Sequence, residues 1–375
     1  MLSTRRVGIS RDPRPTARRG GVFVALVAAA VLGAGPGRVR PAAAQPSPRV
    51  HVVATGGTIS NREGGRLSAA EVASLAPGIE RYAQLSTEQF SNTASGALTV
   101  AQYLALAKRL NALYRDDPGL AGIVVAMGTD TMEELAWFLH LTVRDPRPVV
   151  VVGSMRNPSQ VGFEGPANIL AAVRVAADPA ARGVGTVVVL NDEIHSAREV
   201  AKTDARRLQT FRAGEYGVLG VVDPDRVVWV RRPIQRHSAT SEFDVERIDS
   251  LPRVDILLTY QGAPADLITA AASAGASGIV VAVAGAGAMS GTQAAGVREV
   301  RDRGVFVVTA TRTGSGRISA GTADRTATTD AATERRRAHT LVAEDHAPLK
   351  ARLLLMLGLA TTREGHELQR MFREY

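Results

Sequence analysis

Two short segments of this sequence combine hydroxyl side chains with glycine, and each directly follows a run of β-branched residues. The first, Ala54-Thr55-Gly56-Gly57-Thr58-Ile59, follows an apolar run that begins at Val50. Glycines permit backbone conformations that other residues resist, and the exposed N–H groups of such a turn can stabilise an oxyanion. The segment predicts either an ordinary strand-to-loop turn or a site that presents the Thr55 hydroxyl at a sheet edge.

The second segment, Met127-Gly128-Thr129-Asp130-Thr131-Met132-Glu133-Glu134, follows another apolar run. Thr131 and Glu134 have the spacing of a capping box and predict the start of a helix. Capping does not account for Thr129 and Asp130, which precede that helix. A hydroxyl and a carboxylate at this position could hold the charged groups of a small amino acid.

Lys202 is the third candidate, shortly after Asn191-Asp192. A lysine drawn out of water beside Thr129 could have a lowered pKa and accept a hydroxyl proton, so that a threonine becomes reactive without histidine. A solvated surface lysine is the simpler interpretation of this residue taken alone.

Short apolar runs rich in β-branched residues recur along the chain, and the segments between them are long enough for right-handed crossovers. They predict parallel strands at 50–54, 122–126, 149–153, 186–190, 254–259, 279–283 and 305–309. The expected fold is α/β, with two doubly wound, mainly parallel-sheet domains, the larger one N-terminal and the smaller one C-terminal. Ligands of such sheets gather at the carboxyl ends of the strands, where the two hydroxyl-glycine segments lie.

The periodicity lapses in a polar stretch before Pro252, which we interpret as a linker. The expected organisation is an export signal at 1–44, an N-terminal domain at 49–232 with the candidate threonines, a linker at 233–252 and a C-terminal domain at 253–375. The polar segment 320–337, rich in Thr and Arg, predicts a loop.

The formal charge of +9 is unevenly distributed. Residues 1–44 contain eight arginines and one aspartate, a net +7, so only +2 belongs to the remainder. A nucleic-acid partner is therefore unsupported. The apolar stretch from Val22 to Leu32, followed by small residues before Gln45, is typical of a cleaved export signal, with the Sec and twin-arginine routes both open. We expect a periplasmic or secreted protein without a membrane span after removal of this leader.

The chain contains no cysteine, so disulfides, thiol nucleophiles and two-cysteine amino-acid racemases are excluded. Histidines are scattered without the spacing of metal ligands, and no metal or other cofactor is expected.

Together, and in this order, the two hydroxyl-glycine segments resemble the signature motifs of bacterial type II L-asparaginases and glutaminase-asparaginases. Similarity extends over nearly all of the chain after the leader, and the segments that carry it are 148–156, 165–168, 191–192, 202–203, 216–217, 243–244 and 350–352.

The resemblance implies that Thr55 is the nucleophile that forms an acyl-enzyme, with Thr129, Lys202 and Asp130 as a second catalytic group. It implies substrate contacts from Gly57, Thr58, Ser95, Gly96, Thr129 and Asp130. It also implies a homotetramer, built as a dimer of dimers, in which each site is completed by a neighbouring subunit. The expected reaction is hydrolysis of asparagine to aspartate and ammonia, with glutamine as a further candidate substrate.

The sequence departs from the family pattern at several positions. No tyrosine follows the first motif closely, since Tyr82 is distant. Gly96 replaces a larger polar residue, Ala288 replaces an asparagine, and Glu334 is a weak candidate for the acidic residue that reaches the neighbouring subunit. We expect substrate binding to be affected more than the chemistry, since each lost polar contact could cost about 1.5–3 kcal/mol.

Two alternatives remain open. A periplasmic amino-acid-binding protein would also have two α/β domains, although it would need neither a nucleophile nor a base. A related amidase for a larger or unusual amide would suit the short loop after the first motif and Gly96.

Overall fold

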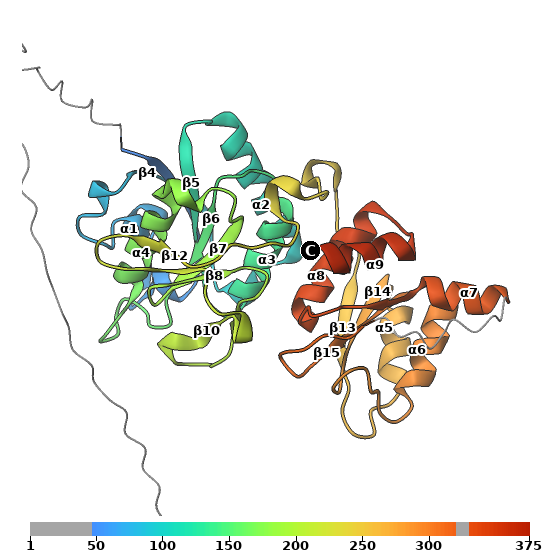
Figure 1. The fold of residues 1–375 in the computed structure, drawn as a ribbon. Helices are drawn as coiled ribbons and strands as arrows, with labels where there is room; N and C mark the ends of the chain where they lie inside the picture. Colours follow the sequence, from blue (N-terminus) through green and yellow to red (C-terminus); the bar gives the residue numbers. More distant parts are fainter. Residues whose placement is uncertain (1–46, 320–329) are drawn as a thin grey trace, which may run out of the picture. The chain divides into compact units, whose positions relative to one another are not determined.

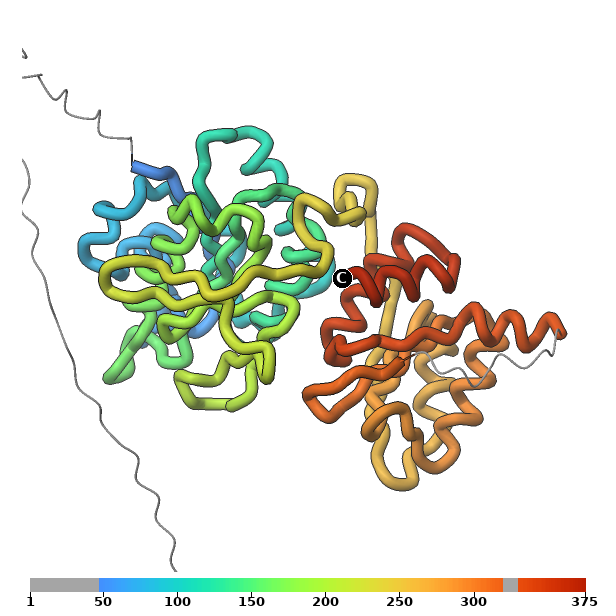
Figure 2. The backbone as a smooth tube through the Cα atoms, in the orientation of Figure 1, coloured from blue at the N-terminus to red at the C-terminus, as the bar shows by residue number. Residues whose placement is uncertain are grey.

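The computed structural model describes residues 47–319 and 330–375. Two main sheets lie in this part of the chain (Figures 1 and 2). The leader predicted at 1–44 and part of the loop predicted at 320–337 lie outside the described residues.

The first sheet has eight strands in the order β12-β11-β8-β7-β6-β5-β1-β4. The strands are β1 (Arg49–Gly56), β4 (Gln84–Thr93), β5 (Leu120–Ala126), β6 (Val149–Val152), β7 (Thr186–Leu190), β8 (Glu193–Ser196), β11 (Gly220–Val222) and β12 (Val227–Trp229). Neighbouring strands are parallel from β4 to β7 and antiparallel from β7 to β12.

Valines along the parallel strands alternate between two hydrophobic cores, one on each face of the sheet. Val53 and Val125 belong to one core, whereas Val52 and Val124 belong to the other. Successive side chains of a strand point to opposite faces, so both faces of this sheet are buried. The helices of this domain are α1 (Ala69–Ala73), α2 (Val100–Asp116), α3 (Met132–Thr142) and α4 (Gly165–Ala177). Residues of α2 and α3 enter the first core and residues of α1 and α4 the second, which is the doubly wound arrangement predicted.

The second sheet is fully parallel, with the order β13-β14-β15-β16. Its elements are β13 (Val254–Leu258), α5 (Asp266–Ser273), β14 (Gly278–Val283), α6 (Gln293–Asp302), β15 (Phe306–Thr311), α7 (Ala331–Ala338), β16 (Thr340–Val342), α8 (Pro348–Thr361) and α9 (Gly365–Glu374). Helices α5 and α6 cover one face, and the leucines of α8 cover the other. The predicted two-domain α/β class is confirmed. The second sheet is not doubly wound as predicted, because its strands follow chain order and its crossover helices α5 and α6 enter the same core on one face. The loop predicted through residue 337 is wrong for its last part, because Asp330 caps α7 by accepting a hydrogen bond from the Thr333 amide.

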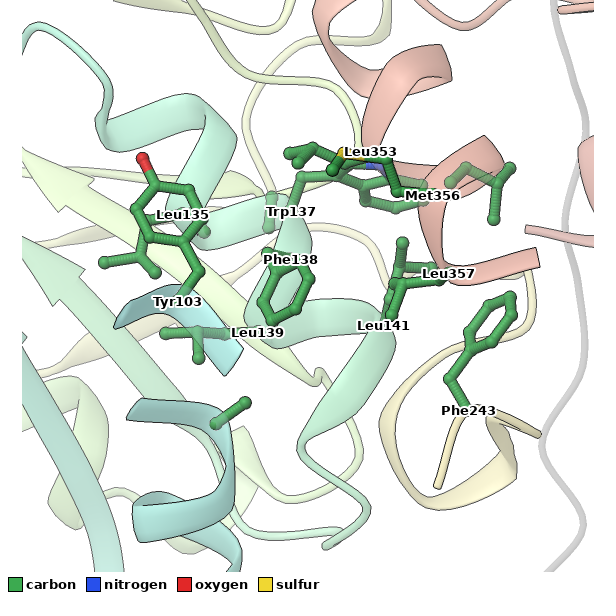
Figure 3. Packing of buried hydrophobic residues seen from close by; sticks show 14 of the residues in the cluster. Tyr103, Leu135, Trp137, Phe138, Leu139, Leu141, Phe243, Leu353, Met356 and Leu357 are labelled. Atoms are coloured by element: carbon green, nitrogen blue, oxygen red, sulfur yellow. The ribbon is translucent and has the colours of Figure 1, made fainter. Parts of the chain in front are cut away.

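Helix α8 shares its core with α3 of the first domain (Figure 3). Trp137 and Leu141 of α3 pack with Leu353 and Leu357 of α8, and all four are fully buried. The Trp137 indole N–H also donates a hydrogen bond of 3.1 Å to the carbonyl of Lys350. The two sheets are therefore joined by continuous apolar packing.

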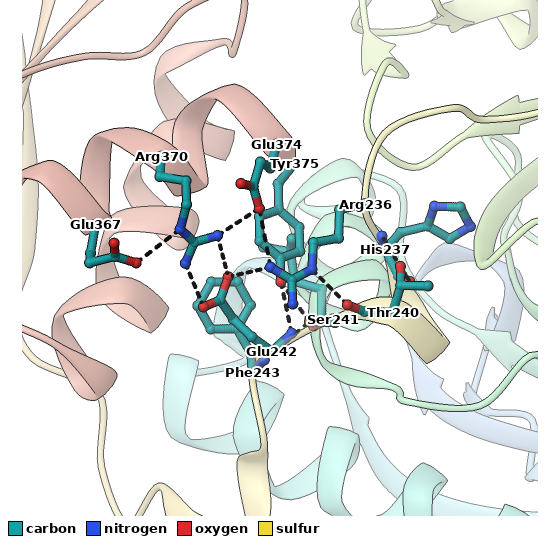
Figure 4. A network of polar contacts seen from close by, with 11 residues as sticks. Arg236, His237, Thr240, Ser241, Glu242, Phe243, Glu367, Arg370, Glu374 and Tyr375 are labelled. Carbon is teal, nitrogen blue, oxygen red and sulfur yellow. Dashed lines mark hydrogen bonds and ion pairs between the residues drawn. The ribbon is translucent and has the colours of Figure 1, made fainter.

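A polar network provides another connection (Figure 4). Both Nη atoms of Arg370 in α9 donate to the Glu242 carboxylate, at 3.2 and 2.8 Å, and Arg236 donates to the same carboxylate at 2.9 Å. The segment between the first and second sheets is thereby tied to α9 by bidentate charge-assisted hydrogen bonds.

Two short pairs of strands lie outside the main sheets. Strands β2 (Asn61–Arg62) and β3 (Gly65–Arg66) form a short hairpin after β1, and β9 (Ala201–Lys202) pairs with β10 (Phe211–Arg212). None of the helices in the described part of the chain is long and apolar enough to span a membrane.

Candidate active site

Thr55 lies near the end of β1, the strand between β4 and β5, and its residue is only 1% exposed. Its hydroxyl donates a hydrogen bond of 3.3 Å to the carbonyl of Ala126, the last residue of β5. Its own carbonyl accepts a bond of 2.8 Å from the Ser91 hydroxyl of β4. The two neighbouring strands thus hold Thr55 at the carboxyl edge of the sheet, where the sequence predicted it.

The glycines of the first motif bring three chain segments into close contact. A Cβ atom at Gly57 would lie 2.1 Å from the Gly128 amide nitrogen, and one at Gly128 would lie 2.9 Å from the Ser95 hydroxyl. Gly57 also has φ of 84°, a left-handed conformation that disfavours other residues. Neither Gly57 nor Gly128 could therefore carry a side chain, because the two motifs and Ser95 meet closely at these positions.

Lys202 joins the second motif directly. Its ammonium group donates hydrogen bonds of 3.0 Å to Thr129 Oγ1 and 2.5 Å to Asp130 Oδ1. Thr129 is 4% exposed, whereas the Asp130 side chain is 79% exposed. The simpler interpretation of Lys202 as a solvated surface residue is wrong, because its side chain is only 13% exposed and has two polar partners.

The capping box predicted for Thr131 and Glu134 is wrong. The Thr131 side chain makes no cap hydrogen bond to helix α3 and instead donates a bond of 3.1 Å to the Ser95 carbonyl. Glu134 Oε2 lies 4.0 Å from Arg352 Nη1 of α8, and burial raises the pKa of the Glu134 carboxyl. Both side chains therefore contact distant residues and do not cap their own helix. Thr131 links the second motif to the turn at Ser95–Ala97.

The remaining predicted substrate residues lie around the same loops. Thr58 begins a 3-10 turn after Gly57 and is partly buried, and Ser95 is 4% exposed. A Cβ atom at Gly96 would meet no atom within 4 Å. The structure places open space where the family pattern has a larger side chain. No hydrogen bond links Thr55 with Thr129 or Lys202 in the described parts of the chain.

The other positions that depart from the family pattern make different contacts. Tyr82 contacts the Arg174 guanidinium, whose central carbon is 5.2 Å from the ring centroid. Ala288 is exposed in a turn bridged to Ala284, and Glu334 is exposed in the first turn of α7. The short loop after the first motif forms the β2–β3 hairpin, and its Glu63 amide donates a bond of 2.8 Å to the Ser159 hydroxyl.

Two buried charged residues behind Lys202 received no role from the sequence. The Lys202 amide donates a bond of 3.3 Å to Glu133 Oε1, and Glu133 is 8% exposed. Burial raises the pKa of the Glu133 carboxyl, while the nearby charge of Lys350 opposes that shift. Lys350 stands in the Lys-Ala-Arg segment of the resemblance, but the sequence did not indicate its burial. Across residues 47–319 and 330–375, no cluster of three or more His, Cys, Asp or Glu side chains could hold a metal ion.

Both domains match known sequence families. The chain is a two-domain α/β protein whose residues 49–235 match the family described as asparaginase, N-terminal. Residues 253–372 match the glutaminase/asparaginase C-terminal domain. The protein belongs to the asparaginase family.

Individual members of this family can be aligned with most of this chain. The chain is 39% identical to L-asparaginase 2 from Bacillus subtilis, covering 88% of this chain and 87% of that one. It is 34% identical to glutaminase-asparaginase from Pseudomonas fluorescens, covering 87% and 90%. A crystal structure of a probable cytoplasmic L-asparaginase from Campylobacter jejuni superimposes with a TM-score of 0.81 at 34% identity, covering 88% of this chain and 100% of that chain.

Proposed function

We propose that this protein hydrolyses the side-chain amide of L-asparagine to L-aspartate and ammonia, and that glutamine is a second substrate. The observation that carries the proposal is the contact of Lys202 with both Thr129 and Asp130, at 3.0 and 2.5 Å. It supplies a hydroxyl, a base and a carboxylate beside the loop of Thr55. Family membership and relatives named for both activities support the same reaction.

In the proposed reaction, Thr55 Oγ1 attacks the side-chain carbonyl carbon and forms an ester bond while the carbon–nitrogen bond breaks. The hydroxyl proton leaves with the nitrogen as ammonia. Water then attacks the ester carbon; one of its protons returns to Thr55 and the other is taken up by the released ammonia, so the product leaves as a carboxylate. Lys202 accepts a hydroxyl proton through Thr129, and Asp130 orients the lysine and binds the substrate ammonium.

The remaining predicted residues would bind the substrate. Thr58 would offer its backbone N–H and its hydroxyl to the developing oxyanion, and Ser95 would bind the α-carboxylate. Gly57, whose N–H donates to the Thr93 carbonyl at 2.9 Å, would let the substrate approach closely. Gly96 would allow close approach without contributing a side-chain contact.

Steady-state ammonia release from asparagine and glutamine tests the proposal, with Thr55→Ala as the decisive variant. We expect turnover by the wild-type protein and its loss in Thr55→Ala, with thermal unfolding of the variant showing that it remains folded. Binding of asparagine without ammonia release would instead favour the amino-acid-binding protein. Unchanged turnover in Thr55→Ala would contradict the nucleophile.

A second candidate is hydrolysis of a larger or unusual amide. The observation that favours it is the unfilled space at Gly96, which could admit a bulkier group than an α-carboxylate. A panel of amides with extended or substituted α-groups, monitored for ammonia, separates the two candidates. A higher kcat/KM for such an amide than for asparagine would support this candidate.

We also propose that the protein is exported and assembles as a homotetramer. The arginine-rich start, apolar stretch and small residues within 1–44 support export, and N-terminal sequencing of secreted protein should find Gln45 first. Family membership supports the assembly, and Glu334 is exposed in the first turn of α7, where a neighbouring subunit could contact it. Light scattering should give four times the subunit mass, and a monomer with full activity would contradict the tetramer.

A further inference from the structure

Lys350 of the second domain binds the segment that carries Lys202. It lies in the first turn of α8 and is 2% exposed. Its ammonium group donates hydrogen bonds of 2.6 Å to the Arg198 carbonyl and 2.7 Å to the Val200 carbonyl. Because these carbonyls are two residues apart, one side chain fixes the backbone immediately before β9, where Lys202 stands.

Arg198 ties the same segment to the second domain from its own side chain. Its two Nη atoms donate to Asp345 at 2.9 and 2.7 Å, and its Nε donates to the Tyr375 carbonyl at 2.6 Å. Bidentate pairs of this kind are directional as well as strong. The start of the segment is thus held independently of Lys350.

Glu133 holds the other end of the segment through the Lys202 amide. Burial lowers the pKa of Lys350 to about 7, and the charge of Glu133 opposes that shift. Each of these two buried groups therefore stabilises the charged form of the other. Removal of only one would leave an uncompensated charge in the interior, which is strongly destabilising.

Apolar packing restrains this segment on one side only, where Val200 is fully buried in the core. On the other side a cavity of about 720 Å³ borders the segment and is lined by Ala201, Thr203 and Lys350 among others. Residues that face this space have fewer van der Waals neighbours there. The hydrogen bonds from Lys350 restrain the backbone on this side.

We propose that Lys350 is a positioning residue, which holds Lys202 within hydrogen-bonding distance of Thr129 by binding the carbonyls of Arg198 and Val200. The inference rests on the proposed function, in which Lys202 is the base. A misplacement of about 1 Å in a catalytic group can cost about 100-fold in rate. The second domain thereby contributes to the first domain's chemistry within one chain.

Lys350→Met tests this proposal because methionine has a similar length but cannot donate. We expect kcat for ammonia release to fall at least about tenfold while KM changes less than about twofold, because Lys350 binds the backbone just before the base and not the substrate-binding loops. Hydrogen exchange of the amides in 198–203 should become faster. Arg147→Met is the matched control, since it removes a cation that is only 10% exposed and donates to the carbonyls of Tyr114, Asp117 and Leu120, which lie outside this segment. It should leave kcat and this exchange unchanged.

A double variant separates positioning from stability. Glu133→Gln combined with Lys350→Met removes both buried charges, so thermal stability should recover relative to Lys350→Met alone. Its kcat should remain low, because the carbonyls of Arg198 and Val200 still lack their donor. Recovery of kcat together with stability would overturn the proposal.

The two proposals fail in different ways. A wild-type protein that releases no ammonia from either amino acid would overturn the proposed function. Hydrogen exchange would still test whether Lys350 holds the backbone of 198–203. If the wild type is active and Lys350→Met retains both its kcat and its exchange rates, only the positioning role of Lys350 would be overturned.

Discussion

Gly57 and Gly128 are in direct backbone contact, so that a Cβ atom on Gly57 would lie 2.1 Å from the Gly128 nitrogen. This contact joins the two motifs that the sequence places more than seventy residues apart. The distance is far below any allowed contact between a carbon and a backbone nitrogen. The loops can therefore meet only if residue 57 has no side chain.

Gly57→Ala should accordingly lower both thermal stability and ammonia release. Gly183→Ala is a matched control, because Gly183 has φ of 82°, close to the 84° of Gly57, but no atom lies within 4 Å of its added Cβ. We expect the control to cost about 1 kcal/mol from backbone strain, with activity retained. Equal unfolding temperatures for the two variants would contradict the contact.

Lys202→Met should reduce kcat by about 100-fold or more, the usual range for loss of a general base. Arg207→Met is a suitable control, since this arginine lies in the following loop with a side chain that is 81% exposed. Its kcat should match the wild type. Ammonia release over a range of asparagine concentrations measures both variants, and a Lys202→Met enzyme with normal kcat would rule out the lysine as base.

Gly96→Gln should lower KM for asparagine. An added Cβ at this position meets no atom within 4 Å, and a new polar contact to a charged group worth about 1.5–3 kcal/mol corresponds to roughly ten- to hundredfold tighter binding. Gly96→Ala adds a Cβ without a polar group and should leave KM unchanged. If glutamine and alanine had the same effect, a missing polar contact would not explain weak binding.

His346 should make the protein sensitive to acid. The side chain is buried against Trp137 and Phe372, and no hydrogen bond reaches its Nε2 within the described residues. Burial, followed by the charge of Arg198, lowers the pKa of His346 to about 3, although Asp345 opposes the shift. The folded state therefore binds fewer protons than the unfolded state between pH 3 and 6.5, and stability falls as pH drops through this window.

His346→Asn removes this titration while offering an amide donor near the position of Nδ1, which hydrogen-bonds the Ala343 carbonyl. The wild type should lose about 3 kcal/mol from His346 between pH 7 and 4.5, and the variant should lose correspondingly less. Urea unfolding at the two pH values measures the difference. Parallel losses in both proteins would place the acid sensitivity elsewhere.

The strands predicted from apolar runs are present and parallel, because strands buried on both faces are recognisable from sequence alone. β4 was missed because its sequence, from Gln84 to Thr93, is mostly polar and it occupies a sheet edge. The antiparallel strands β8, β11 and β12 were also missed, since two of them have three residues and their pairing depends on distant partners.

The α/β class, the two hydroxyl-glycine segments and their place after buried strands could be predicted from sequence, because they follow from local composition and from the tendency of ligands to bind at the carboxyl edge of parallel sheets. Only the tertiary structure decided the partners of Thr131, Lys202 and Lys350. Hydrogen bonds and burial depend on which distant segments meet in space, and one side chain can satisfy either a local cap or a remote carbonyl. The Thr131 hydroxyl donates to the distant Ser95 carbonyl and not to the start of its own helix. Lys350 is buried because its side chain binds the Arg198 carbonyl of the other domain.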